Sequence, residues 1–205
     1  MARRSDQTAP TIAPRATHRR RRPLPLARVA LLSITALFTA TVVVFAVMQL
    51  ITLPRLAELA EARPFDTRFF GYDRASAVAF LKALGPGGRA EYLWIQLRLD
   101  NVFPVLYGLS LSLLLADVLG RAGLATRWAF LLAFCVVLPT AALDLAENAT
   151  IAEMLRRPPD AVGVELVARA SLHTTLKWAS AAFGFAVAAL ALILAARRAR
   201  KDIGS

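Results

Sequence analysis

The sequence predicts an all-α fold: a four-helix transmembrane bundle with an amphipathic helical hairpin on the outer face between spans 1 and 2. Two observations support this fold class. The chain is 57% apolar, which is unusual for a soluble domain. It also contains apolar stretches close to the length of about 20 residues that a helix needs to cross a bilayer. These stretches cover residues 29–53, 101–120, 128–148 and 174–196.

A basic tail precedes the first span. Residues 1–28 combine Pro, Thr, Ala and Arg without apolar periodicity, so we expect a disordered cytoplasmic tail. Eight of the 25 basic residues precede Val29 and four follow Ala196, so much of the net charge of +11 is terminal. Terminal charge fits membrane topology and lipid headgroups better than a nucleic-acid footprint. We therefore predict no nucleic-acid partner.

The first span carries no charge, and its length favours an uncleaved signal anchor over a cleaved export signal. Pro54 is predicted to end this helix. Beyond it, Asp73 is placed to cap a helix with the sequence RASAVAFLKALG, which GPGG then breaks. A second amphipathic piece, residues 89–100, runs into the second span.

We interpret residues 66–100 as an extracytoplasmic helical hairpin that rests on the outer membrane surface. A small soluble cap is the alternative. The expected interfacial anchors are the aromatic residues of this region, Phe65, Phe69, Phe70, Tyr72 and Trp94.

The distribution of basic residues predicts the orientation. The amino tail, the turn at residues 120–127 and the carboxyl-terminal RRARKD are basic, whereas residues 148–173 balance three Arg against three acids. Both termini are therefore expected in the cytoplasm, including the tail at residues 199–205, and an even number of spans agrees. The membrane domain itself is expected to cover residues 29–198.

Polar residues gather where the third span ends. In the stretch TAALDLAEN, the side chains of Asp144, Glu147 and Asn148 share one helical face. Unpaired charge inside a bilayer is expensive, so this face needs a partner, and Lys177 in the last span is the obvious one.

Each predicted span carries a polar residue at a similar number of residues from its outer end, and therefore at a similar depth in the membrane. This predicted layer consists of Gln49, Tyr107, Asp144 and Lys177, with Asp100, Glu147, Asn148, His173 and Thr174 just above it.

Three interpretations of the layer remain open. The residues form a lock that only holds the helices together, in a structural or accessory subunit that contacts other membrane proteins. Alternatively, they bind a small polar ligand or a lipid headgroup. In the third interpretation, an intramembrane enzyme uses Asp144 or Glu147 as a base with Lys177 or His173 as an acid.

The sequence favours a protein that is not an enzyme. It lacks the HExxH pattern of a metalloprotease and the GxSxG pattern of a nucleophile elbow. We assign no catalytic residue, no metal site and no cofactor, and we expect the lipid bilayer and a bound lipid or small polar molecule as partners.

Three segments together resemble an uncharacterised group of bacterial four-span membrane proteins. They are GYDRASAVAFLKALGPGGRAEYLWIQLRLDNVFPVLYG, DLAEN and TTLKW, and the resemblance covers about residues 66–197. It implies four helices, and a multi-pass location in a bacterial cytoplasmic (inner) membrane. It implies no activity, so no functional residue is carried over.

Overall fold

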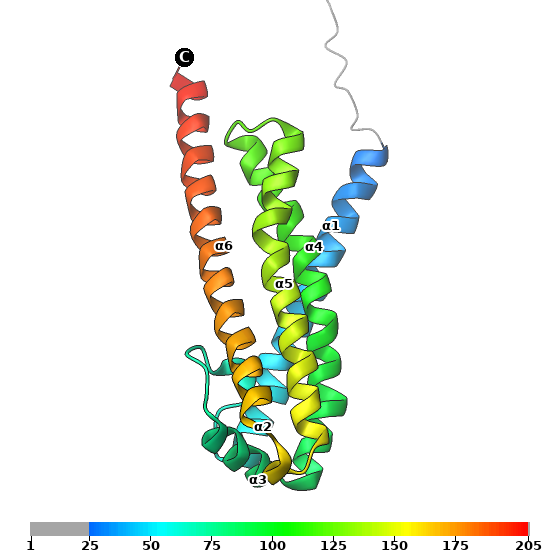
Figure 1. Cartoon of the computed structure of the whole chain (residues 1–205). Coiled ribbons are helices and arrows are strands. Elements are labelled where there is room, and N and C mark those ends of the chain that lie inside the picture. The colour runs from blue at the N-terminus through cyan, green and yellow to red at the C-terminus, as the bar shows by residue number, and fades with distance from the viewer. Residues whose placement is uncertain (1–24, 205) are drawn as a thin grey trace, which may run out of the picture.

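The computed structural model describes residues 25–204, which form a bundle of four long helices (Figure 1). These are α1 (Pro25–Val47), α4 (Leu97–Arg121), α5 (Thr126–Arg156) and α6 (Val164–Gly204). Helices α4 and α5 pack together, α1 packs on α4, and α6 packs on both α5 and α4. The predicted all-α four-helix bundle is confirmed. Of the predicted tail at residues 1–28, residues 1–24 lie outside the described residues.

The four long helices are long and apolar enough to cross a membrane. Large apolar side chains are exposed along their outer surfaces, including Leu50 on the first helix and Phe183 and Leu190 on α6. Apolar surface of this extent is normally covered by lipid or by a partner. The chain is therefore an integral, multi-pass membrane protein. The amino end of α1 and the carboxyl end of α6 lie at the same end of the bundle (Figure 1).

The first helix continues past Pro54, so the prediction that Pro54 ends it was wrong. A π-helical turn, η1 (Met48–Thr52), precedes the short helix α2 (Leu53–Ala60). The N–H of Leu53 donates to the carbonyl of Met48 across this wide turn. Pro54 then sits in the first turn of α2, where a missing N–H donor is tolerated. The helix ends at Glu61, which adopts a left-handed conformation with φ 47°.

Residues 53–96, which we call the cap, cover the end of the bundle opposite the chain termini. Besides α2 the cap contains η2 (Phe65–Thr67), α3 (Arg74–Glu91) and the π-helical turn η3 (Tyr92–Gln96). The predicted start of α3 is confirmed, because Asp73 Oδ1 accepts a hydrogen bond of 2.8 Å from the N–H of Ser76. The predicted break at GPGG is also found, at Gly85, with φ 63° and ψ −178°.

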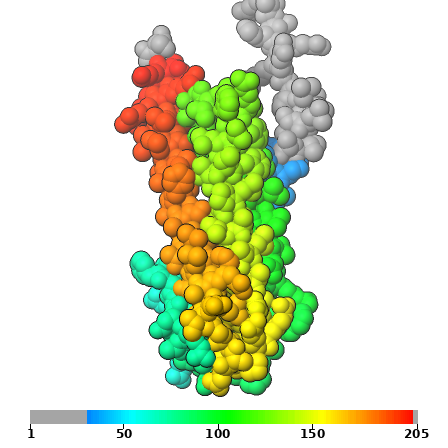
Figure 2. Space-filling model, viewed as in Figure 1, coloured from blue at the N-terminus to red at the C-terminus, as the bar shows by residue number. Residues whose placement is uncertain are grey.

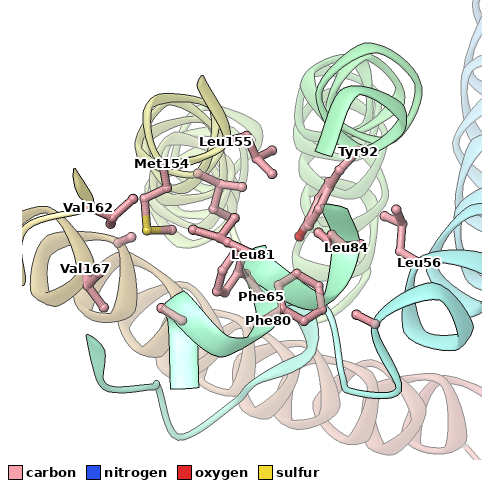
Figure 3. Packing of buried hydrophobic residues seen from close by; sticks show 14 of the residues in the cluster. Leu56, Phe65, Phe80, Leu81, Leu84, Tyr92, Met154, Leu155, Val162 and Val167 are labelled. Atoms are coloured by element: carbon pink, nitrogen blue, oxygen red, sulfur yellow. The ribbon is translucent and has the colours of Figure 1, made fainter. Parts of the chain in front are cut away.

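The cap has its own hydrophobic core, shown in Figure 3. Phe80 and Leu81 of α3 are buried against Phe65, Tyr92 and residues of α5 and α6. The apolar face of α3 therefore covers protein, in a compact unit built against α5 and α6. The position of residues 66–100 relative to the membrane surface stays a prediction. Phe65 is fully buried and is no interfacial anchor, whereas Phe70 is 99% exposed.

Helices α5 and α6 extend beyond the predicted spans to form one wall of the cap. Residues 148–173, which separate the predicted third and fourth spans, are mostly helical, and only residues 157–163 connect Arg156 to Val164. The reason is a continued apolar pattern, since Ile151, Met154 and Val167 are buried against the cap. Figure 2 shows the cap packed continuously against the ends of these two helices. The last connection includes the short 3₁₀ turn η4 (Pro159–Ala161).

Candidate functional site

A partly open cavity of about 500 Å³ lies between the helices of the bundle, bordered by all four long helices and by η2 of the cap. Most of its wall is apolar, with contributions from every long helix: Val42, Phe45, Leu111, Leu115, Val136, Phe185 and Leu192. The end next to the cap is different. This polar end is lined by Gln49, Asp66, Asp100, Tyr107, Asp144, Lys177 and Trp178.

Lys177 of α6 is held between two acids of α5. Its Nζ lies 2.9 Å from Asp144 Oδ1 and also forms an ion pair with Glu147. The Lys177 side chain is only 10% exposed, and those of Asp144 and Glu147 are 6% and 0% exposed. The acids lie one helical turn apart on α5, as their spacing predicts, so both face the same ammonium group. Charges this buried are tolerated only when paired.

Neighbouring side chains complete the hydrogen bonds of these acids. The hydroxyl of Tyr107 on α4 donates to Asp144 Oδ2 over 3.1 Å. The hydroxyl of Thr174 on α6 donates to the carboxylate of Glu147. Asn148 Nδ2 donates to the backbone carbonyl of Asp100 over 2.9 Å, which ties α5 to the start of α4. The ion pairs join α5 to α6, and the hydrogen bonds of Tyr107 and of the Asp100 carbonyl add α4.

Asp66, which the sequence analysis did not select, closes the polar end from the cap side. Its Oδ2 accepts a 2.9 Å hydrogen bond from the Tyr92 hydroxyl, and its backbone carbonyl accepts one of 3.1 Å from Trp178 Nε1. Burial raises the pKa of Asp66 to about 7, and the negative charge of Glu147 adds to the increase. The one signal in the sequence that could have indicated Asp66 is its position as an acid among the aromatic residues of RPFDTRFFGY. Those aromatic residues were interpreted as interfacial anchors.

Two π-helical turns meet beside the polar end. The hydroxyl of Thr52 in η1 donates to Gln96 Oε1 in η3. Gln49, which lines the cavity, belongs to η1, and Tyr92, which holds Asp66, belongs to η3. π-Helical turns often occur at functional sites because they redirect side chains locally. Here η1 carries Gln49, which lines the polar end, and η3 carries Tyr92, which donates a hydrogen bond to Asp66.

The structure brings together most of the predicted polar layer. Gln49, Asp100, Tyr107, Asp144 and Lys177 all line the cavity. Glu147 and Asn148 are buried just behind these residues and reach the site through Lys177 and Asp100.

His173 lies apart from the cavity lining and is half-buried. Within residues 31–202, no group of three or more His, Cys, Asp or Glu side chains is positioned to hold a metal ion.

Comparisons with known proteins assign the chain to no family. No protein-family model matches the chain, and no curated protein or solved structure matches it either. The functional argument therefore rests on the geometry of the cavity.

Proposed function

We propose that this membrane protein binds an amphipathic molecule, with a polar headgroup at the polar end of the cavity and an apolar chain along its walls. The observation that supports this is the division of one cavity into two chemically distinct parts. A volume of about 500 Å³ is within the range of about 300–1,000 Å³ that is typical of ligand pockets.

The packing order of the helices supports entry from the bilayer. Helix α1 packs on α4, and α6 packs on α5 and α4, whereas α1 and α6 are not among the helix pairs that pack closely in the described residues. Both of these helices nevertheless line the cavity, through residues such as Phe45 and Phe185. A ligand with an apolar chain would enter between them from the lipid, without crossing water.

The ion pairs of Lys177 have a supporting role in this proposal. Asp144, Glu147 and Lys177 satisfy one another and fix α5 against α6. The headgroup then binds in front of this fixed cluster. The lock and the ligand site are thus two parts of one structure, and the residues that hold the helices also shape the cavity.

The proposed orientation places both termini in the cytoplasm, so that the cavity's polar end lies in the outer leaflet. The α4–α5 turn, which is flanked by Arg121 and Arg127, lies at the same end of the bundle as the carboxyl-terminal part of α6, which carries Arg197 and Arg198. This distribution favours a cytoplasmic location for that end. A bacterial cytoplasmic membrane is proposed from the resemblance alone.

Native mass spectrometry of the protein released from neutral detergent tests the proposal. We expect a retained lipid-like mass on the wild type and its loss in Ala181→Phe, which fills the cavity. Ala182→Phe is the matched control, since Ala182 is exposed on the outer face of the same helix and does not line the cavity. Equal retention by the two folded variants would contradict the proposal.

One observation favours a second candidate, a structural or accessory subunit that contacts other membrane proteins. The strongest polar interactions, those of Lys177, are all satisfied inside the chain, as a helix lock requires. In that case the wild type carries no specific mass, Ala181→Phe has no cellular effect, and loss of Lys177 prevents assembly with partners.

A further inference from the structure

Two buried carboxylate oxygens at the polar end lack a partner in the described part of the chain. They are Asp66 Oδ1 and Asp100 Oδ2. Asp66 is 6% exposed and Asp100 is 3% exposed, and both residues line the cavity. Buried acceptors are almost always satisfied, so each such oxygen calls for a donor that the chain itself does not provide.

The charges at the polar end do not balance. Four carboxylates gather there, Asp66, Asp100, Asp144 and Glu147, and Lys177 is the only basic side chain among the residues described as lining the cavity. Its ammonium group is already paired with Asp144 and Glu147. Asp66 and Asp100 therefore line the cavity without an ion-pair partner, and the cost of ionising Asp66 there is reflected in its pKa, which burial raises to about 7.

We propose that the ligand carries a cationic, ammonium-type headgroup that Asp66 and Asp100 bind, with a single apolar chain extending away from them. This inference rests on the proposed function and specifies its ligand class. A cation satisfies both orphan oxygens and removes the excess negative charge. An anionic headgroup would instead meet four carboxylates and one ammonium group that is already occupied.

Aromatic rings at the same end suit an ammonium group. Phe103 and Tyr107 both line the cavity, and their ring centroids lie 4.9 Å apart in an edge-to-face arrangement. Ring faces attract ammonium groups, particularly quaternary ones. In this proposal the cation contacts carboxylates and aromatic rings at the polar end, while the apolar chain contacts Leu111, Leu115 and the apolar part of the cavity wall.

Three probes with the same hexadecyl chain separate headgroup recognition from chain binding. Hexadecyltrimethylammonium, hexadecanol and hexadecanoate are titrated at low concentration into the protein in nanodiscs of neutral lipid, and binding is followed by native mass spectrometry. We expect the cationic probe to bind at least about tenfold more tightly than the other two. The quaternary headgroup has no titratable proton, so its charge is fixed.

The variants Asp66→Asn and Asp100→Asn are expected to lose this preference, by about tenfold each, while hexadecanol binding stays unchanged. Asp117→Asn is the matched control, because Asp117 is an exposed acid on α4 that pairs with Arg121 away from the cavity. Should either Asn variant fail to fold, the other variant and the wild-type selectivity still decide the outcome.

The two proposals fail in different ways. Equal binding of the three probes, or a preference for hexadecanoate, would overturn the cationic headgroup and leave the amphiphile site standing. If no probe binds the wild type more tightly than it binds Ala181→Phe, the amphiphile site itself is wrong.

Discussion

Lys177 Nζ lies 2.9 Å from Asp144 Oδ1 across the interface of α5 and α6, at the boundary between the buried ion pairs and the cavity. This contact joins two residues that are 33 positions apart in the sequence. The same ammonium group also pairs with Glu147, so removal of the Lys177 side chain leaves two buried acids without their counter-charge.

The first prediction concerns the loss of that ammonium group. Lys177→Met should lower the free energy of unfolding by about 3–5 kcal/mol, because two buried carboxylates lose their counter-charge. Thermal unfolding in neutral detergent measures the change. Lys82→Met is the control, since Lys82 pairs with Asp160 in an ion pair whose side chains are 54% and 78% exposed. That exposed pair should be worth less than about 1 kcal/mol, and equal losses in the two variants would contradict the buried lock.

The second prediction exchanges the charges. The double variant Asp144→Lys with Lys177→Asp should be more stable than Lys177→Asp alone, by about 1–3 kcal/mol, because the exchange restores an opposite pair across α5 and α6. A double-mutant cycle of melting temperatures gives the coupling. The ligand mass should still be lost, since the shape of the polar end changes. Retention of the ligand by the exchanged protein would place the headgroup elsewhere.

The third prediction is a pH dependence of stability that Asp66 controls. Its pKa is raised from 3.8 to about 7, so the folded state holds the proton more tightly than the unfolded state does. The resulting stabilisation is fully present below about pH 4 and is lost as the pH rises through about 7. The melting temperature of the wild type should therefore fall between about pH 5 and about pH 8, relative to that of Asp66→Asn.

Several charged or titratable groups surround Asp66 in this experiment. They are Glu147 and Asp144 from α5, Lys177 from α6, Asp100 from α4, and Tyr72 and Tyr92 of the cap. The difference between wild type and Asp66→Asn isolates the contribution of Asp66 from the titration of these neighbours. Parallel melting curves across the pH range would show that Asp66 titrates normally.

The fourth prediction tests how the cap loop is fastened to α6. Gly71 has φ +82°, and a Cβ there would lie 2.5 Å from Ser171 Oγ, the atom that accepts a hydrogen bond from the N–H of Tyr72. Gly71→Ala should therefore cost about 1–3 kcal/mol through backbone strain and displacement of that contact. Gly87→Ala is the control, since nothing lies within 4 Å of its Cβ position. A neutral Gly71→Ala would mean that the loop is not held at this point.

The residues themselves predicted the pairing of α5 with α6. Helical spacing puts Asp144 and Glu147 on one face, and the cost of unpaired charge in a bilayer calls for Lys177 opposite them. Tyr107 could be selected in the same way, by its depth in the span. These inferences succeed because the thickness of the bilayer and the helix period limit where a polar side chain can lie.

The cap was predicted less well. Its helix α3 and the capping role of Asp73 follow from local signals, but the interfacial role assigned to Phe65 was wrong. An aromatic side chain at a membrane boundary and one in a small core look alike in the sequence. Only the packing of α3 against α5 and α6 distinguishes them.

The sequence alone determined the number of spanning helices, the all-α class and the acidic face that meets Lys177, because these depend on hydrophobicity and on the period of one helix. The tertiary structure decided that Pro54 lies within a continuing helix, that Asp66 folds back to the polar end, and that the helices leave a partly open cavity between them. Each of these depends on contacts between segments far apart in the chain, such as Tyr92 with Asp66 and Trp178 with Asp66. No local pattern encodes such contacts, since they form only when all the helices have packed.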